Sequence, residues 1–345
     1  MVRSSYYHHM NIRLAYMYFV RLRVSRPPPL FDLLLRASMA CLARRDLVPS
    51  IASGLMGRLR LYIESLLLAD NLMPTPNYVA MHMHNFSQLL MQTQVGKPLL
   101  FRKRHTLSLM FDVSAVQSEM SIDCPDDLIV GYTQSMMGFL LLNPDPRHIG
   151  MVGLGGGSLA KFCYRNLTRT SIAVAEICPA VIALRDQFHI PKDDDRLQIH
   201  CIDGSELIAR ADSQFDVLMI DGFDKHGQPP QLCSQQFYDN CYRALSPNGV
   251  MVVNLLGDDP ETLLLAARIH YAFNGVSIAV DALDSLNKIV FACKGIGLDL
   301  PEQVLKSRVG VLDSLPPIAT RHIVNSILRH RHTIGRLAQS PLQTA

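Results

Sequence analysis

The chain has 345 residues, of which 48% are apolar and 18% are charged. This composition is typical of a globular protein and excludes a disordered one. Because no apolar run reaches the length of a membrane span, we expect a cytoplasmic protein without a transmembrane segment. The eight cysteines are scattered without CxxC spacing, so we expect free thiols and no zinc or other metal site.

The first predicted unit, residues 1–97, is a basic and partly helical extension. Residues 1–104 carry 14 Lys and Arg against four Asp and Glu, whereas the formal net charge of the whole chain is +3. A targeting segment, a contact with an anionic surface, and sequence upstream of the true start would each give this composition. No recognised reader motif accompanies the charge, so we expect no nucleic-acid partner.

From Pro98 the pattern changes to three short alternating segments, which predict a small antiparallel β segment over residues 98–127. These segments are residues 99–102, 106–111 and 115–120. The apolar residues that follow predict a helix over residues 128–142. Two prolines in the sequence NPDP at residues 143–146 end this helix.

Strands and helices alternate regularly beyond this point. The predicted strands are residues 149–153, 172–176, 197–202, 215–221 and 250–255, with helices that start near Ser158, Pro179, Ser205, Ser234 and Pro260. Right-handed crossovers between such strands produce a parallel sheet with helices on both faces. Two later segments, residues 276–280 and 289–293, flank turn-forming residues and predict a closing hairpin.

The predicted fold class is therefore α/β. It is a Rossmann-like, doubly wound, mostly parallel sheet with a terminal antiparallel hairpin, preceded by the small antiparallel β segment. We expect the Rossmann-like domain to span residues 128–295 and a helical C-terminal tail to span residues 296–345.

The most informative motif is a glycine-rich turn, GLGGGS at residues 153–158, between the first strand of this alternation and its helix. Gly153, Gly155, Gly156 and Gly157 lack the Cβ that would block positive φ and the close approach of a ligand. The free N–H groups of the helix start then face the bound molecule. Glu176 ends the next strand, where a carboxylate can accept both hydroxyls of a ribose. The pattern predicts a nucleoside-type cofactor.

A second motif follows the fourth strand of the alternation. Residues 215–224 read FDVLMIDGFD, and QQFY at 235–238 and RALSPNGV at 243–250 come after them. With this combination, residues 106–293 resemble the spermidine and spermine synthases, which are polyamine aminopropyltransferases. The resemblance implies a class I S-adenosylmethionine-dependent transferase of polyamine biosynthesis. Its implied cofactor is decarboxylated S-adenosylmethionine, or S-adenosylmethionine itself, without a metal, and it further implies a small-molecule amine substrate and a possible homodimer.

The resemblance also implies roles for single residues. The implied cofactor-binding residues are Gln117, Gly153, Gly155, Gly157, Glu176, Asp203 and Gly204. Glu176 matches the acid that binds the cofactor ribose, and Asp203 matches an acid near the adenine, where its carboxylate can accept from the exocyclic amine. On the substrate side, Tyr132 falls beside the site, and Asp224 helps to hold the cationic amine.

Asp221 resembles the catalytic aspartate of the family. The reaction is attack by an amine on the carbon next to a sulfonium, and the amine is normally protonated. A carboxylate at Asp221 can take that proton and orient the nitrogen. Asp221 could instead be a strand-end acid that caps the following turn, since such acids are common. We favour the catalytic role, because the strand, the loop and the helix after it match together.

Three positions on the amine side depart from the family pattern. Gly156 stands where the family usually has an aspartate, Thr133 and Gln134 stand where a His-Glu pair is frequent, and residues 279–287 lack the tyrosine of the family's late TYPSG stretch. The acceptor pocket is therefore expected to be altered.

Three functions remain open on the sequence. They are aminopropyl transfer to an amine, methyl transfer from S-adenosylmethionine on the same fold, and nucleoside binding by a catalytically degenerate homologue. A basic group near the glycine turn that could bind the amino-acid carboxylate of S-adenosylmethionine would favour methyl transfer. Lys161 is a candidate for that group, but we expect it to be a solvated helix residue.

Overall fold

The computed structural model describes residues 98–112, 115–224, 227–257, 259–283, 285–316 and 318–337. Contacts divide the chain into two compact units, residues 1–93 and 94–345, and all described residues belong to the second unit. The basic extension predicted over residues 1–97 lies outside the described residues. The account that follows concerns the second unit alone.

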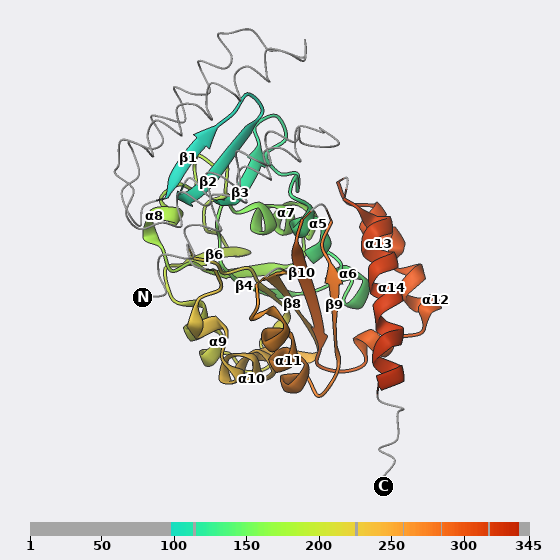
Figure 1. The fold of residues 1–345 in the computed structure, drawn as a ribbon. Coiled ribbons are helices and arrows are strands. Elements are labelled where there is room, and N and C mark those ends of the chain that lie inside the picture. Colours follow the sequence, from blue (N-terminus) through green and yellow to red (C-terminus); the bar gives the residue numbers. More distant parts are fainter. Residues whose placement is uncertain are drawn as a thin grey trace, which may run out of the picture. The chain divides into compact units, whose positions relative to one another are not determined.

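The described part begins with the predicted small antiparallel sheet, which Figure 1 shows in teal. Its strands are β1 (Leu99–Arg102), β2 (Thr106–Asp112) and β3 (Ala115–Ser121), in the order β1-β2-β3. The buried side chains of Leu109 and Met120 join the core of the α/β fold. The register shifts between Leu109 and Met110, so that Gln117 is the extra residue between two paired positions of β3.

The predicted mostly parallel sheet is confirmed, and its described strands follow the order β6-β5-β4-β7-β8-β10-β9. They are β4 (His148–Val152), β5 (Ser171–Ala175), β6 (Leu197–His200), β7 (Phe215–Ile220), β8 (Leu245–Leu256), β9 (Ser277–Asp281) and β10 (Asn287–Cys293). The first five are parallel, and β10 runs antiparallel to both β8 and β9. The chain moves outward from β4 to β6 and then returns to the other side of β4 at β7. The sheet therefore has a topological switch point between β4 and β7.

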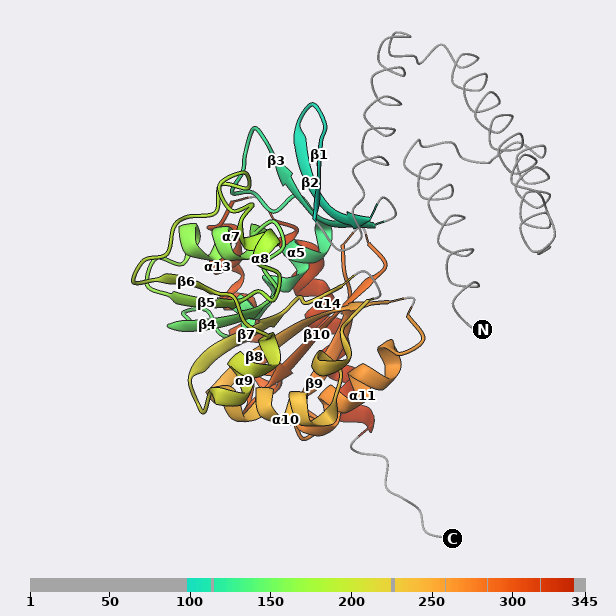
Figure 2. The same cartoon turned by 90° about the vertical axis from the view of Figure 1, so that its left-hand side faces the viewer.

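Helices cover both faces of this sheet, as the fold class predicts. Helices α9 (Gly204–Arg210), α10 (Gln235–Ala244) and α11 (Thr262–Ala272) lie on one face, and α5 (Gly131–Met136), α6 (Phe139–Leu142) and α7 (Ser158–Asn166) lie on the other (Figures 1 and 2). The apolar strands supply both cores because successive side chains point to opposite faces. In β7, Val217 and Met219 enter one core, and Leu218 and Ile220 enter the other.

The single helix predicted over residues 128–142 is two shorter helices, α5 and α6. Between them, i to i+3 hydrogen bonds tighten the backbone, such as the one from Gly138 N to Ser135 O at 3.1 Å. A Cβ at Gly138 would lie 2.8 Å from Ile323 and 2.9 Å from Phe291. The break thus lies where the C-terminal helix and β10 pack closely on the chain.

The C-terminal residues pack on the same core as α5 to α7. They form α12 (Glu302–Ser307), α13 (Val309–Asp313) and α14 (Thr320–Leu337), after a short 3-10 turn, η2 (Gly297–Asp299). Ile323 and Ile327 are buried in this core. Arg308 Nη1 donates to the carbonyls of Leu141 at 2.8 Å and Leu142 at 2.9 Å, so it satisfies the C-terminal end of α6. No helix in the described ranges is long and apolar enough to cross a bilayer.

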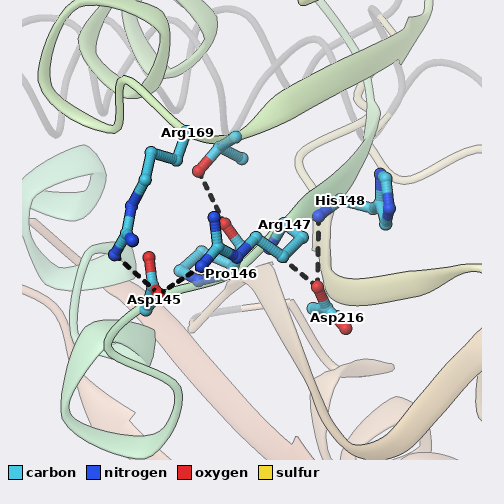
Figure 3. Close-up of polar contacts among 7 residues, drawn as sticks. Asp145, Pro146, Arg147, His148, Arg169 and Asp216 are labelled. Carbon is cyan, nitrogen blue, oxygen red and sulfur yellow. Dashed lines mark hydrogen bonds and ion pairs between the residues drawn. The ribbon is translucent and has the colours of Figure 1, made fainter.

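Polar contacts fix the amino ends of the central strands (Figure 3). Asp216 Oδ2, in β7, accepts from the backbone N–H groups of Arg147 at 2.7 Å and His148 at 3.1 Å, where β4 begins. Asp145 accepts from the guanidinium groups of Arg147 at 3.0 Å and Arg169 at 2.8 Å. These contacts hold β4 and β7 in register at one edge of the sheet, and the candidate site lies at the opposite edge.

Candidate functional site

The candidate site lies at the carboxyl ends of β4 and β7. In open α/β sheets, ligands bind at such a switch point. Gly153 directly follows β4 and Asp221 directly follows β7, and Asp221 N donates to Val152 O at 2.9 Å. Gly153 has φ +94°, and a Cβ there would collide with the carbonyl oxygen of Asp221. The glycine turn and the predicted catalytic aspartate are therefore immediate neighbours.

Positive φ angles carry the backbone through the turn into α7, with Gly155 at +53° and Gly157 at +66°. A Cβ at Gly156 would lie 2.7 Å from Ser118 Oγ of β3 and 3.0 Å from the ring of Phe188. No aspartate fits at Gly156 unless these two side chains move. The departure from the family's glycine loop is thus built into the packing around the turn.

Glu176, which follows β5, is buried and anchors the glycine turn. Its Oε2 accepts from Leu154 N at 3.0 Å, and its Oε1 accepts from Cys178 N at 2.8 Å. A carboxylate oxygen has two lone pairs, so each oxygen can accept one further hydrogen bond. The carboxylate can therefore hold the turn and still receive the two hydroxyls of a ribose.

Asp203 is the N-cap residue of α9. Its Oδ1 accepts from Ser205 N at 2.7 Å, and its Oδ2 accepts from Gln231 Nε2 at 3.2 Å. Gln231 lies in a 3-10 turn, η1 (Pro230–Leu232), beyond β7. A Cβ at the next residue, Gly204, would collide with Val152, so glycine lets α9 begin close to the end of β4.

A chain of hydrogen bonds surrounds the half-buried carboxyl group of Asp221. Tyr132 OH, from α5, donates to Oδ2 at 3.1 Å, and Asn254 Nδ2, from β8, donates to Oδ1 at 2.8 Å. Asn254 Oδ1 in turn accepts from Asn287 Nδ2 of β10 at 2.7 Å. Three elements thus orient one carboxylate, and two donors leave each of its oxygens with one unused lone pair.

This setting changes the proton affinity of two groups. Burial raises the pKa of Asp221, and the hydrogen bonds from Asn254 and Tyr132 offset the rise only in part. Burial also raises the pKa of Tyr132, and the charge of Asp221 raises it further, so Tyr132 keeps its proton and acts as the donor. A carboxylate with a raised pKa is a better general base than an ordinary one.

Asn254 was not among the residues predicted from the sequence. Its signal is present, because it is an amide inside the apolar run MVVNLL at residues 251–256. Asn254 is buried, so its side-chain amide requires hydrogen-bond partners. These partners are Asp221 and Asn287. A buried amide near the carboxyl end of an apolar strand could have indicated the site.

Two further predicted residues lie in the loop after β7 and in β3. Asp224 is exposed in the loop after β7, where its N–H donates to Gly227 O at 2.9 Å. Gln117 is half-buried in β3, beside Ser118, whose Cβ is 3.6 Å from the Cβ position of Gly155. The structure gathers the other predicted residues at one sheet edge, and the ligand contacts of all of them stay predictions.

Thr133 and Gln134, which replace the family's His-Glu pair, bind backbone groups. Thr133 Oγ1 donates to Val130 O at 2.6 Å, and Gln134 Nε2 donates to Leu128 O at 2.7 Å. Gln134 Oε1 accepts from Ala319 N at 3.0 Å, next to the start of α14. These hydrogen bonds connect α5 to the segment before it and to the start of α14.

The expectation that Lys161 is solvated is wrong. Its side chain is fully buried in α7, and its Nζ donates to the carbonyls of Pro125 at 2.6 Å and Phe188 at 2.7 Å. The small sheet and the residues after α8 (Pro179–Ile182) cover this part of α7. Across the described residues, His, Cys, Asp and Glu side chains form no group of three that could hold a metal ion.

Comparisons with known proteins show which proteins the chain is similar to. The spermine/spermidine synthase domain family matches residues 130–261. A polyamine aminopropyltransferase of Chromobacterium violaceum is 33% identical over 232 residues, which cover 67% of this chain and 89% of that protein. The eEF1A lysine and N-terminal methyltransferase of Homo sapiens is 31% identical over 137 residues, which cover 35% of this chain and 20% of that protein.

Among solved structures, a spermidine synthase crystallised with the transition-state analogue AdoDATO superposes with a TM-score of 0.54. The superposition covers 71% of this chain and 90% of that chain, at 19% sequence identity. This likeness shows a shared fold.

Proposed function

Because the chain belongs to the spermine/spermidine synthase family, we propose that it transfers an aminopropyl group from decarboxylated S-adenosylmethionine to an amine. One observation carries the proposal. The carboxylate of Asp221 abuts the glycine turn at the switch point of the sheet, and two donors hold it in place. A nucleoside on the turn would have its reactive end beside this carboxylate.

The chemistry balances with Asp221 as the base. The lone pair of the amine nitrogen attacks the methylene carbon bonded to the sulfonium, and a new C–N bond forms. The C–S bond breaks, and its electron pair stays on sulfur, which leaves a neutral thioether nucleoside. The proton released from the amine passes to the carboxylate of Asp221, whose raised pKa favours that transfer. The oriented carboxylate also aligns the nitrogen for attack.

The remaining assignments divide between the two substrates. On the nucleoside side we assign the ribose to Glu176 and the adenine to Asp203 and Gly204, with the glycines of the turn and Gln117 beside them. On the amine side we assign Tyr132 and Asp224. Negative charge at Asp221 and Asp224 suits two positively charged reactants. The same proposal includes a homodimer as the family resemblance implies, and a cytoplasmic location, because the described cysteines are free thiols.

A calorimetric titration of the purified chain with S-adenosylmethionine and with its decarboxylated form tests the proposal. Aminopropyl transfer predicts tighter binding of the decarboxylated form, since the site as assigned offers no cation to the extra carboxylate. A clear preference for intact S-adenosylmethionine would contradict the proposal and favour methyl transfer. Binding of both forms without turnover of any amine would leave a nucleoside-binding homologue without catalysis.

A further inference from the structure

Lys161 is a buried cation just beyond the glycine turn. It lies one helical turn after Gly157, to whose carbonyl its N–H donates at 2.8 Å, and 0% of its side chain is exposed. Its ammonium group has three N–H donors. They meet Pro125 O at 2.6 Å, Phe188 O at 2.7 Å and Met120 Sδ at 3.1 Å. All three acceptors are neutral.

These acceptors belong to the segments that enclose the glycine turn. Met120 lies in β3, two residues from Ser118, and Pro125 lies in the connection from β3 to α5. Phe188 lies beyond α8, and its ring is 3.0 Å from the Cβ position of Gly156, which also lies 2.7 Å from Ser118 Oγ. One side chain therefore hydrogen-bonds to both segments that contact the turn at Gly156, the β3 segment and the Phe188 segment.

Burial of the charge disfavours a lysine at this position. Burial of a cation among neutral acceptors costs free energy, and an apolar side chain of similar volume would avoid that cost. Burial lowers the pKa of Lys161 to about 8, because it disfavours the charged form of the side chain. What the lysine supplies is three directed hydrogen bonds from one atom, which an apolar residue cannot supply.

We propose that Lys161 is a positioning residue of the nucleoside site, which fixes the Phe188 segment and β3 against the glycine turn and so keeps the turn in its binding conformation. The inference rests on the proposed nucleoside site. It assigns to Lys161 no contact with the ligand. Lys161 controls the position of the Phe188 ring next to Gly156.

The hydrogen bonding of Lys161 should respond to pH. A neutral amine has two N–H donors and would turn its lone pair toward one of the three acceptors, so the contact weakens as pH rises through about 8. Asp126, in the connection after β3, raises the pKa of Lys161, and Arg165 on α7 lowers it. On the other packed segments, His189 is exposed, and Glu119 of β3 accepts from side chains of β2.

The test measures binding of 5′-methylthioadenosine, the thioether nucleoside that aminopropyl transfer leaves behind, by calorimetry between pH 6.5 and 9.5 in roughly half-unit steps. Lys161→Met keeps an unbranched side chain, shorter by one atom, and removes the charge. We expect its Kd to rise about tenfold or more, since one displaced polar contact is worth that much. The matched control, Lys192→Met, removes an exposed lysine and should bind like the wild type.

The pH profile separates positioning from a merely structural role. The Kd of the wild type should rise as pH passes through about 8, and the Kd of Lys161→Met should not. A Lys161→Met variant that binds normally, with a wild type whose affinity is flat over this range, overturns the inference. Failure of the wild type to bind the nucleoside at all overturns the proposed function instead, and this inference with it.

Phe188→Leu decides the matter if Lys161→Met does not fold. This variant removes the ring from Gly156 and leaves the carbonyl that Lys161 binds. An increase of Kd by about tenfold supports the inference, because it shows that the ring shapes the turn. An unchanged Kd in a folded Phe188→Leu variant overturns it.

Discussion

The hydrogen bonds and the burial of Asp221 determine its affinity for a proton. Two donors, Tyr132 and Asn254, hold its carboxylate, and burial raises its pKa. Both donors are neutral, so neither cancels the negative charge that a cationic amine would meet. In the proposed reaction, the raised pKa of Asp221 would favour transfer of the amine proton to its carboxylate.

Asp221→Asn should abolish most turnover with little effect on nucleoside affinity. The amide keeps an oxygen that can accept from Asn254 but cannot take a proton, and loss of a general base typically costs about 10²- to 10⁴-fold in kcat. Product formation measured by mass spectrometry, with calorimetry of 5′-methylthioadenosine binding, checks this. Asp224→Asn is the matched control and should mainly raise KM for the amine. Joint loss of turnover and affinity in Asp221→Asn would indicate a structural role.

Tyr132→Phe should move the acid limb of the pH profile of kcat/KM upward. The hydroxyl of Tyr132 donates to the charged carboxylate and so lowers the pKa of Asp221, and its loss raises that pKa further. Because the base works only when deprotonated, less enzyme is active at low pH. The expected shift is roughly one pH unit, since a hydrogen bond to a charged group is worth about 1.5 kcal/mol. Tyr271→Phe, at an exposed position, should leave the limb in place.

At the scale of the elements, the site depends on how closely β4 and β7 end. Gly153→Ala should destabilise the protein by about 3 kcal/mol or more, because a Cβ at positive φ is strained and meets the backbone of Asp221. Urea unfolding followed by circular dichroism measures the loss. Gly310→Ala is the control, since a Cβ there meets nothing within 4 Å in α13, and it should stabilise by about 0.5 kcal/mol. Equal effects of the two changes would contradict this account of the turn.

The elements that the sequence predicts well are the buried strands, because a strand covered on both faces is a short apolar run between turn residues. The break between α5 and α6 was not predictable in this way. The close packing at Gly138 comes from Phe291 and Ile323, which are far away in the chain. The burial of Lys161 was not predicted for the same reason. The sequence of α7 does not indicate that the small antiparallel sheet packs over this lysine.

Some residues of the candidate site were likewise predictable from local motifs, and others were not. Gly153, Glu176 and Asp221 stand in local motifs, and the parallel sheet brings the ends of their strands to one edge. Asn254 and Tyr132 meet Asp221 only through the tertiary fold, from β8 and α5. Local patterns thus predict the sheet edge of the candidate site, and the fold determines which side chains hydrogen-bond to Asp221 there.

At the scale of the whole described unit, the C-terminal helices share a core with the Rossmann-like sheet. Ile327→Ala should therefore lower the free energy of unfolding by about 2 to 4 kcal/mol, because a fully buried isoleucine is lost beside Gly138. The midpoint of a single cooperative urea transition measures it. Asn325→Ala, at an exposed position of α14, should change stability by less than about 0.5 kcal/mol. An unchanged midpoint in Ile327→Ala would show that α14 does not share the core.

The packing at Gly156 makes two positions interdependent. The Cβ of an aspartate introduced there would lie 3.0 Å from the ring of Phe188 and 2.7 Å from Ser118 Oγ, so both side chains must shift to admit it. The family's usual acid in the turn is therefore easier to accommodate in this chain when residue 188 is smaller. Redesign of amine preference in this protein should gain more from paired exchanges at residues 156 and 188 than from Gly156 alone.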